Sequence, residues 1–387
     1  MNNSAIITLN AGSSSLKFSV YAAGSEPQLL ALGQVENLGG DSLLSIAAAT
    51  QDKQTHAIGH ADHQAALQAI LQHIQPVIAG RNVAGIGHRI VHGGTLYDTP
   101  QRLNDALLEQ LATLSPFAPL HQPHNIKAVK AAQLAFPDAL QVGCFDTAFH
   151  FGQNWVNKTY GLPRRFYEQG VRRYGFHGLS YQFISSELTR LAPEVANKRV
   201  VIAHLGSGSS MCALENGRSV SCTMGFSALD GLPMGTRCGQ IDPGVLLWML
   251  DQGMNAADIT SLLYKECGLK GLSGISNDMR TLKQSDQPEA AQAISYFIER
   301  IRREIGSLTA ALGGLDALVF CGGIGERDAD LRRQVCANLD WLGVELDETS
   351  NASNATLISR GRLPVMVIPT DEERVIANAV NDALLNP

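Results

Sequence analysis

The chain has 387 residues, enough for two or three domains of about 150 residues each. Its composition, 45% hydrophobic and 17% charged, is that of a globular protein and excludes a disordered chain. The formal net charge of −6 argues against a protein that coats nucleic acid or an anionic membrane. The 37 glycines exceed the roughly 27 that average usage would give. Such a surplus points to loops where the backbone approaches a ligand.

The N-terminus and the cysteines indicate a cytoplasmic protein. Residues 1–4 are polar and carry no basic side chain, unlike a secretory signal, and no apolar run is long enough to cross a bilayer. The seven cysteines are scattered and never spaced C-x-x-C. We therefore expect reduced thiols rather than disulfides or a zinc site, and neither a membrane nor a nucleic acid as partner.

In chain order, the first predicted unit is a strand at 5–9, a turn at 10–15 and a strand at 16–21. The same strand, Gly/Ser turn and strand return over residues 200–214. Two such units half a chain apart favour a duplicated architecture.

Helices fill the intervals between the predicted strands. Apolar residues at helical spacing predict helices at 64–78 and 289–312. A strand at 365–368 leads into a closing helix, for which Thr370 and Glu373 have the spacing of a capping box. This alternation of strands and helices predicts an α/β chain with mixed sheets.

Three glycine-rich turns follow apolar strands, at 10–15, 204–210 and 321–326. One such turn is usually only a hairpin. Three of them at strand ends favour anion binding, because small residues leave backbone N–H groups free and ligands bind at the carboxyl ends of strands. Lys17 could add a positive charge for a phosphate.

Several chemically active side chains lie among glycines or aromatic residues. Arg89 and Arg237 sit near glycines, in settings that suit bidentate contacts to phosphate or carboxylate, although surface ion pairs are commoner. Asp146 lies among aromatic residues, where an unpaired carboxylate is costly, so we expect it to meet a cation. His177 lies between glycines near two arginines, and a structural role is its alternative.

At these residues the sequence resembles the acetate kinase family. The resemblance is carried by residues 10–17, 145–150, 172–180, 231–237 and 322–326, which follow the family's order. The matching motifs run from residue 10 to residue 373 and so cover the whole chain.

The resemblance implies an α/β fold of two related actin/Hsp70-like (ribonuclease H-like) domains facing a cleft. The first domain would comprise residues 1–150 plus 372–387, and the second residues 151–371. It also implies a homodimer that transfers the γ-phosphoryl group of ATP reversibly to acetate, giving acetyl phosphate and ADP, with Mg²⁺ as cofactor and Mn²⁺ as its alternative.

Site residues are carried over from the resemblance as expectations. The catalytic group would be Arg89, Asp146, His177 and Arg237, and Asn10 and Glu372 would lie on the Mg²⁺ side. The acyl group would be bound by Arg89, Val91, Leu120 and Phe176. The nucleotide would contact Ser13, Ser15, Lys17, His204, Leu205, Gly206, Ser207, Gly208, Asp278, Met279, Arg280, Gly323, Ile324, Gly325, Glu326 and Arg327.

The acceptor in such a reaction needs no general base, because a carboxylate with a pKa of about 4 is already ionised at neutral pH. Asp146 is therefore expected to position the metal or an arginine rather than to move a proton. Charge stabilisation of a loose, in-line transition state would come from the arginines, His177 and Mg²⁺.

Residues 221–223 depart from the family pattern, and so do four single residues that leave alternatives open. Ser207 and Arg327 stand where the family usually has Asn, which raises a pyrophosphate or GTP donor as a possibility to test. Ala228 replaces a proline at the acyl pocket, which makes propionate or another short-chain acid the alternative substrate. Asp371 adds a negative charge beside Glu372. A more distant alternative is an Hsp70/actin-like ATPase switch.

Overall fold

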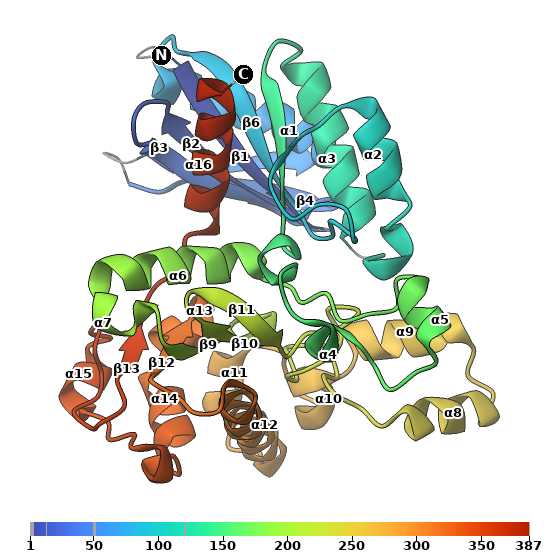
Figure 1. Ribbon diagram of the computed structural model, residues 1–387. Coiled ribbons are helices and arrows are strands. Elements are labelled where there is room, and N and C mark those ends of the chain that lie inside the picture. Colours follow the sequence, from blue (N-terminus) through green and yellow to red (C-terminus); the bar gives the residue numbers. More distant parts are fainter. Residues whose placement is uncertain (1–3, 13, 49–51, 120, 387) are drawn as a thin grey trace. The chain divides into compact units, whose positions relative to one another are not determined.

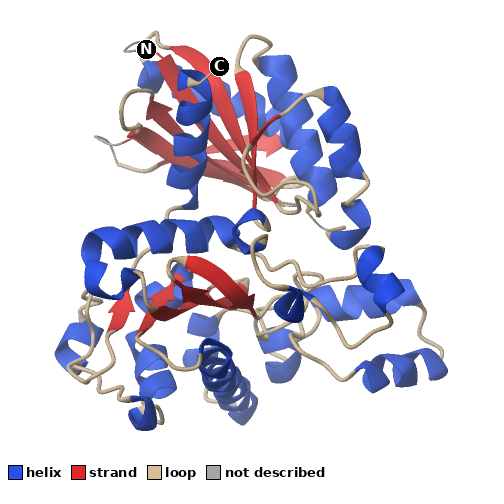
Figure 2. Cartoon of the chain, in the orientation of Figure 1, coloured by secondary structure: helices blue, strands red, loops and turns tan. Residues whose placement is uncertain are grey.

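The computed structural model describes residues 4–12, 14–48, 52–119 and 121–386 (Figure 1). The described chain contains both helices and strands (Figure 2). The chain divides into two compact units, Met1–Phe151 with Asp371–Pro387 and Gly152–Thr370. Compactness alone does not establish independent folding, so the two domains with the boundaries given above stay a prediction.

The first unit is built on an eight-stranded sheet of order β5-β4-β3-β2-β1-β6-β8-β7. Strands β1 to β5 form an antiparallel series, whereas β6 is parallel to β1 and β8 is parallel to β6. The strands are β1 (Ser4–Ala11), β2 (Ser15–Ala22), β3 (Gln28–Glu36), β4 (Asp41–Ala48), β5 (Gln54–His60), β6 (Asn82–Ile90), β7 (Gln101–Arg102) and β8 (Leu140–Phe145).

The second unit is built on a five-stranded sheet of order β11-β10-β9-β12-β13. Its first three strands are antiparallel neighbours, while β12 is parallel to β9 and β13 is parallel to β12. The strands are β9 (Arg199–Leu205), β10 (Ser209–Glu215), β11 (Arg218–Cys222), β12 (Ala317–Cys321) and β13 (Val365–Val367).

The two sheets share one topology. The order β3-β2-β1-β6-β8 in the first corresponds to β11-β10-β9-β12-β13 in the second, with the same strand directions. In each, an antiparallel meander is followed by two strands parallel to its first. This confirms the predicted α/β class with two related halves, and it extends the short repeat seen in the sequence to a whole sheet.

Helices of the first unit cover both faces of its sheet. They are α1 (His63–Ile78), α2 (Asp105–Ala112), α3 (Gln122–Ala135) and the C-terminal α16 (Glu372–Leu385), with 3-10 turns at Ser115–Phe117 and Ala148–His150. Helices α1 and α3 share a buried apolar cluster with the face of β6 that carries Ile86. Because side chains alternate along a strand, Gly85 and Gly87 face the other way, where α16 packs (Figure 1).

The close approach of α16 depends on these two glycines. A Cβ built on Gly85 would lie 2.5 Å from Val380 Cγ1, and one built on Gly87 would overlap Ile376. The missing side chains therefore bring α16 against β6 and carry its first residue, Glu372, to the end of that strand.

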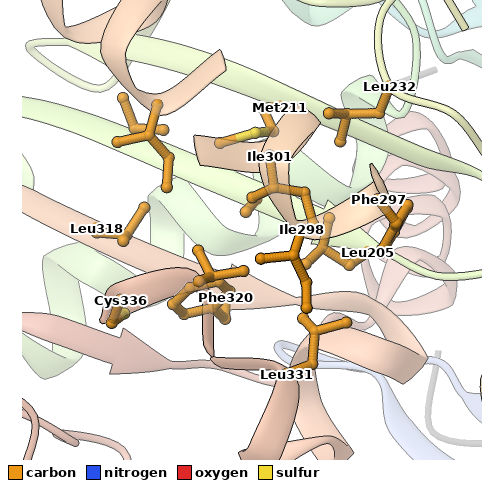
Figure 3. Close-up of a cluster of buried hydrophobic side chains, with 14 of the residues drawn as sticks. Leu205, Met211, Leu232, Phe297, Ile298, Ile301, Leu318, Phe320, Leu331 and Cys336 are labelled. Carbon is orange, nitrogen blue, oxygen red and sulfur yellow. The ribbon is translucent and has the colours of Figure 1, made fainter. Parts of the chain in front are cut away.

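In the second unit the long helix α12 (Pro288–Leu312) packs on the sheet. Its residues Phe297, Ile298 and Ile301 are buried in a hydrophobic cluster. The same cluster includes the strand residues Leu205 and Phe320 (Figure 3). Burying each such side chain contributes about 1.5–3 kcal/mol. Gly313, at φ +67°, ends the helix at the predicted place.

The remaining helices of this unit are mostly short. They are α4 (Trp155–Lys158), α5 (Arg164–Glu168), α6 (Gly178–Leu191), α7 (Pro193–Ala196), α8 (Pro243–Asp251), α9 (Ala256–Lys265), α10 (Gly268–Ser273), α11 (Met279–Lys283), α13 (Gly322–Arg327), α14 (Ala329–Cys336) and α15 (Glu348–Ala352), with a 3-10 turn at Asp340–Leu342. Within the described ranges, no helix is both long enough and apolar enough to span a bilayer.

Two local predictions were wrong. The N-cap of α16 is Asp371, whose carboxylate accepts a hydrogen bond from Arg374 N at 2.9 Å, so Thr370 and Glu373 do not form a capping box. A carboxylate one residue nearer the helix outcompetes the threonine hydroxyl for this cap. The glycine-rich segment after β12 is the short helix α13 rather than a turn.

We predict that Gly87→Ala lowers the free energy of unfolding by about 1–3 kcal/mol, because its methyl group would press into Ile376 on α16. Urea denaturation followed by circular dichroism measures the change. The matched control is Gly306→Ala in α12, where the added Cβ meets no atom within 4 Å and should be neutral or stabilising. Equal stability of the two variants would contradict this account of helix docking.

Candidate active site

Residues predicted to carry chemistry gather at one edge of the first unit's sheet. In the parallel pairing, Leu9 lies beside His88, and Ile90 lies beside Phe145. Arg89 in β6 and Asp146, which directly follows β8, therefore share the edge at which β1 ends with Asn10 and Ala11. Across the β1–β2 hairpin, Lys17 pairs with Asn10. We call this set, together with Glu372, the first strand-end edge.

A buried ion pair dominates the first strand-end edge. Arg89 Nε donates to the Asp146 carboxylate at 3.0 and 3.1 Å, and Arg89 Nη2 donates to Oδ2 at 2.7 Å. Asp146 is 1% exposed, whereas the Arg89 side chain keeps 19% exposure. The expectation that Asp146 meets a cation is confirmed, and the two-pronged contact fixes the plane of the guanidinium.

Glu372 approaches the same arginine from α16. Its Oε2 lies 3.3 Å from Arg89 Nη1. Asp371, Glu372 and Glu373 make the start of α16 strongly acidic, which the positive end of the helix dipole favours. Burial and the charge of Glu372 raise the pKa of the Glu373 carboxyl, and the positive charge of Lys17 opposes that rise.

The charges at this edge hold one another in place. Burial lowers the pKa of Arg89, but the carboxylates of Asp146 and Glu372 raise it by more, so the guanidinium stays charged. Burial raises the pKa of Asp146, and the Arg89 charge and hydrogen bonds oppose that rise. The result is a permanent, oriented cation at the end of β6.

The second unit holds a pocket at the matching edge of its own sheet. His204 pairs with Cys321 where the parallel strands β9 and β12 end. A pocket of about 630 Å³ opens beside the turn that follows β9 and the helix α13 that follows β12. Its lining is Gly206, Ser207, Asn277, Asp278, Met279, Arg280, Lys283, Gln284, Gly323, Ile324, Arg327 and Asp328. Its volume falls in the range of small-molecule sites.

Charged side chains line this pocket as ion pairs. Asp278 caps α11 and bonds Arg280 Nη2 at 3.0 Å, and its pKa is lowered chiefly by the hydrogen bond from Arg280. Lys283 Nζ bonds Asp328 at 2.5 Å. With Arg327, the pocket lining carries three cations and two carboxylates, so an anionic ligand meets a net positive wall.

Eight residues expected at the nucleotide line the pocket: Gly206, Ser207, Asp278, Met279, Arg280, Gly323, Ile324 and Arg327. The sequence analysis missed Asn277, Lys283, Gln284 and Asp328. Each lies next to a predicted residue or about one helical turn along the same face, so helical spacing along 277–284 could have found them.

Five other residues of the second unit that were expected at the nucleotide lie outside the pocket lining. Leu205 is fully buried in the apolar core. Glu326 accepts backbone N–H bonds from Gly322 and Thr370 at 2.9 and 3.0 Å, so it braces the pocket wall. The Gly325 carbonyl accepts from the buried Arg332 at 2.8 Å. His204 and Gly208 lie among the side chains described next.

His177, Arg237 and Gly208 come together at the turn after β9. A Cβ on Gly208 would lie 3.1 Å from Arg237 Nη2 and 3.3 Å from His177 Nε2, so both groups face the glycine. Arg237 is anchored by donating from Nη1 to the Ala228 carbonyl at 2.8 Å. His177 stacks on His204 with ring centroids 4.4 Å apart. The arrangement places a guanidinium and an imidazole around one small space.

The remaining expected residues are found as follows. Val91 and Phe176 are buried, 7% and 2% exposed, in the first and second unit respectively. Ser15 starts β2, and its carbonyl accepts from Gly12 N at 2.8 Å, closing the turn. Ser13 and Leu120 lie outside the described residues. The acyl pocket therefore stays a prediction.

The described residues offer a divalent cation only a small number of protein ligands. Within the described part of the chain, no three His, Cys, Asp or Glu side chains gather into a metal-binding group. Mg²⁺ in phosphoryl transfer usually keeps several waters and phosphate oxygens and takes one or two protein ligands. The oxygens of Asn10 and Glu372 at the first strand-end edge fit such an incomplete site.

The chain is similar to acetate kinases over almost all of its length. Residues 5–378 match the model of the acetokinase family. An acetate kinase from Methylocella silvestris is 51% identical, with 96% of each chain covered, and one from Nitrobacter hamburgensis is 46% identical, with 98% of this chain and 96% of that chain covered.

Solved structures agree with this similarity. The structure superposes on Porphyromonas gingivalis acetate kinase with a TM-score of 0.88 at 34% identity, covering 98% of this chain and 100% of that chain. It superposes on a propionate kinase from Francisella tularensis with a TM-score of 0.92 at 33% identity, covering 97% and 98%. The shared sheet topology, the motifs at the strand ends and this full-length similarity together show that the chain belongs to the acetokinase family.

Proposed function

We propose that the chain catalyses the reversible, Mg²⁺-dependent transfer of the γ-phosphoryl group of ATP to acetate, giving acetyl phosphate and ADP. The observation that best supports a carboxylate as acceptor is the ion pair between Asp146 and Arg89. It holds a permanently charged, partly exposed guanidinium in a fixed plane. Such a guanidinium forms charged hydrogen bonds with carboxylate and phosphate oxygens, so it suits a carboxylate acceptor next to a phosphoryl donor.

Transfer through a loose, in-line transition state needs alignment and charge stabilisation rather than covalent help. Arg89 binds and orients the acetate carboxylate in this proposal. Arg237 and His177, which both face Gly208, stabilise the charge that develops on the transferred group. The glycine-lined pocket of the second unit takes the nucleotide, with Arg327 and Lys283 beside its negative charges.

Asp146 is neither base nor nucleophile in this account. It is 1% exposed and both of its oxygens accept from Arg89, so neither is available to attack phosphorus. Acetate is already ionised at neutral pH and needs no base. Asp146 is therefore a positioning residue for Arg89.

Mg²⁺ neutralises phosphate charge when bound, and Asn10 and Glu372 are the residues that would hold it. Glu372 has a carboxylate oxygen 3.3 Å from Arg89 Nη1, so it can orient the arginine as well as a metal. Mn²⁺ prefers similar oxygen ligands and is the alternative ion.

Propionate or another short-chain acid is the second candidate acceptor. The similarity to a propionate kinase and the alanine at position 228 support it. One methylene changes discrimination by only about 1–3 kcal/mol, so some use of both acids is expected. An ATPase switch without an acid acceptor is the remaining alternative. A switch that binds no acid would have no carboxylate to bind to the positive charge of Arg89, which Asp146 holds in place.

The chain is further proposed to act as a cytoplasmic homodimer, with no nucleic acid or membrane as partner. All seven cysteines are free thiols, which suits a reducing compartment. No residue of α8, the whole of which is described, is buried, and Leu247 and Trp248 are more than 60% exposed. An apolar helix in water favours contact with another protein surface, and this face is the proposed dimer contact.

The function is tested by trapping acyl phosphate with hydroxylamine. With ATP and Mg²⁺, we expect acyl hydroxamate from acetate, with a higher kcat/KM for acetate than for propionate or butyrate. GTP and pyrophosphate replace ATP in parallel reactions, because Ser207 and Arg327 line the donor pocket. A preference for propionate would move the assignment to that acid, and ATP turnover without hydroxamate would favour the switch.

We predict that Asp146→Asn lowers kcat/KM for acetate by about 10–100-fold, since the loss of a charged hydrogen-bond partner frees the Arg89 guanidinium. Steady-state kinetics at rising Mg²⁺ should show no rescue, because Asp146 holds an arginine. Glu372→Gln is the comparison, and its activity should recover in part at high Mg²⁺. Rescue of Asp146→Asn by Mg²⁺ would assign this aspartate to the metal instead.

We predict that Gly323→Val weakens ADP binding at least about tenfold, or about 1.4 kcal/mol, without lowering stability. A Cβ on Gly323 meets no protein atom within 4 Å, so the new side chain occupies pocket space only. Isothermal titration with ADP measures the affinity. The control is Gly161→Val, which is equally open but outside the pocket lining. Unchanged binding in Gly323→Val would place the nucleotide elsewhere.

A further inference from the structure

Two stacked histidines in the second unit have matched hydrogen-bond partners. The rings of His177 and His204 are stacked at 4.4 Å with an interplanar angle of 22°. His177 Nδ1 lies 2.8 Å from Ser210 Oγ, and His204 Nδ1 lies 2.8 Å from Ser180 Oγ. Each imidazole therefore has the same nitrogen bound to a serine hydroxyl, although one histidine precedes α6 and the other lies in the last part of β9.

Each serine is backed by a second hydroxyl. Ser210 Oγ lies 2.5 Å from the Tyr181 hydroxyl, and Ser180 Oγ lies 2.8 Å from Thr370 Oγ1. Ser180, Ser210 and Tyr181 are fully buried. The N-cap position 177 and the α6 positions 180 and 181 fall on one face, so the first turn of the helix contributes to both chains of hydroxyl groups.

Proton counting restricts the direction of these hydrogen bonds. A serine hydroxyl has one proton, so Ser210 donates in one of its two bonds and accepts in the other. Burial raises the pKa of Tyr181 well above its ordinary value, so the phenol keeps its proton. If Tyr181 donates to Ser210, then Ser210 donates to His177, and Nδ1 of that ring carries no proton. Ser180 Oγ has Cys321 Sγ as a third, longer partner at 3.8 Å. If Thr370 donates to Ser180, then Ser180 can donate to His204 in the same order.

The opposite direction would have a functional cost. An Nδ1 proton donated inward by a neutral histidine would leave an unprotonated Nε2. Nε2 of His177 faces Gly208 beside Arg237, and Nε2 of His204 lies near Gly206. A lone pair there would repel the oxygen of a phosphate, whereas an N–H would bind it.

Charge favours neutral rings in this place. Two imidazolium ions stacked at 4.4 Å would repel each other, and His177 stands at the positive N-terminal end of the 14-residue helix α6. The Arg237 guanidinium faces the same glycine as His177. A neutral ring has one proton to place, and the hydroxyl groups decide which nitrogen receives it.

We propose that the hydroxyl pairs Ser210–Tyr181 and Ser180–Thr370 are positioning residues that hold His177 and His204 as neutral imidazoles protonated at Nε2, so that both rings present an N–H toward residues 206–208. The use of these donors for a phosphoryl group rests on the proposed function. The tautomer is a property of the ligand-free rings, so it can be measured without any assay of activity.

The direct test is nitrogen NMR of the ligand-free protein labelled with ¹⁵N-histidine at neutral pH. Signals are assigned by their loss in His177→Asn and His204→Asn. We expect each ring to show an unprotonated Nδ1 and a protonated Nε2. A protonated Nδ1 on either ring, or a charged ring, would overturn the proposal for that histidine.

Variants then connect the tautomer to the reaction. In Ser210→Ala and Tyr181→Phe the His177 signals should shift toward a mixture of tautomers, with kcat lowered about 10–100-fold in Ser210→Ala and KM for ATP changed little. Thr370→Val, which keeps the shape but removes the hydroxyl, should do the same to His204, and Thr370→Ser should restore it.

The matched control is Ser185→Ala. This serine lies on the same helix α6 but donates to the Gly217 carbonyl at 3.1 Å, away from both histidines. Its histidine spectrum and kinetics should equal those of the unmodified chain. Unchanged histidine signals in both Ser210→Ala and Thr370→Val would refute the positioning role.

The two proposals fail in different ways. If the unmodified chain forms no acyl hydroxamate while its rings are protonated at Nε2, the acetate kinase activity is wrong and the tautomer assignment holds. If hydroxamate forms while either ring is protonated at Nδ1, the activity holds and the positioning role is lost.

Discussion

The parallel pairing of neighbouring strands is the constraint on which both sites depend. Parallel strands end at the same edge of a sheet, so residues far apart in sequence arrive together there. In the first sheet this brings Arg89 beside Asp146, and in the second it brings His204 to the level of Cys321, where α13 begins. In each unit, a crossover helix or hairpin turn then adds groups at that edge. A change of register by one residue would turn these side chains to the opposite face.

Glycine serves this constraint in two ways. In β6, Gly85 and Gly87 let α16 approach closely enough for Glu372 to reach Arg89. In the second unit, Gly323 leaves open space at the pocket, and at Gly206 a Cβ would lie only 3.3 Å from the Gly208 carbonyl oxygen. The glycine surplus in the composition is thus explained partly by helix packing and partly by the ligand site. The overall negative charge hides a pocket whose lining carries more cations than carboxylates.

Short-range sequence patterns predicted much of the fold and many residues of the candidate site. The two hairpins, the helix ending at Gly313 and the apolar strand before the glycine-rich segment at 321–326 were recognisable from short-range apolar patterns. Strands β3 to β5 were not expected, because their half-exposed residues give a weak alternation, and β5 has no buried residue among those described. Arg89 and Asp146 could be singled out by type and setting, but their contact depends on the pairing of β6 with β8.

The hydroxyl network lay beyond any local pattern. Ser180, Ser210 and Thr370 are separated by up to 190 residues and are ordinary residues in the sequence. The same applies to Glu326, which resembled a nucleotide contact but braces the backbone of Gly322 and Thr370. Asp371 rather than Thr370 caps α16, and this leaves the threonine hydroxyl bonded to Ser180. One sequence signal could have pointed to this network, namely a small polar residue in an apolar strand, such as Ser210 in β10.

The central claim of the proposed function is that ATP and the acetate carboxylate react directly, without a phosphorylated protein group. Asp146 is buried, and both of its oxygens accept hydrogen bonds from Arg89. The most direct measurement is the stereochemical course at phosphorus, using ATP made chiral at the γ-position with oxygen isotopes or sulfur and acetate as acceptor. A single in-line transfer predicts inversion of configuration. Retention would require an even number of transfers through a phosphorylated protein group, and it would contradict this account.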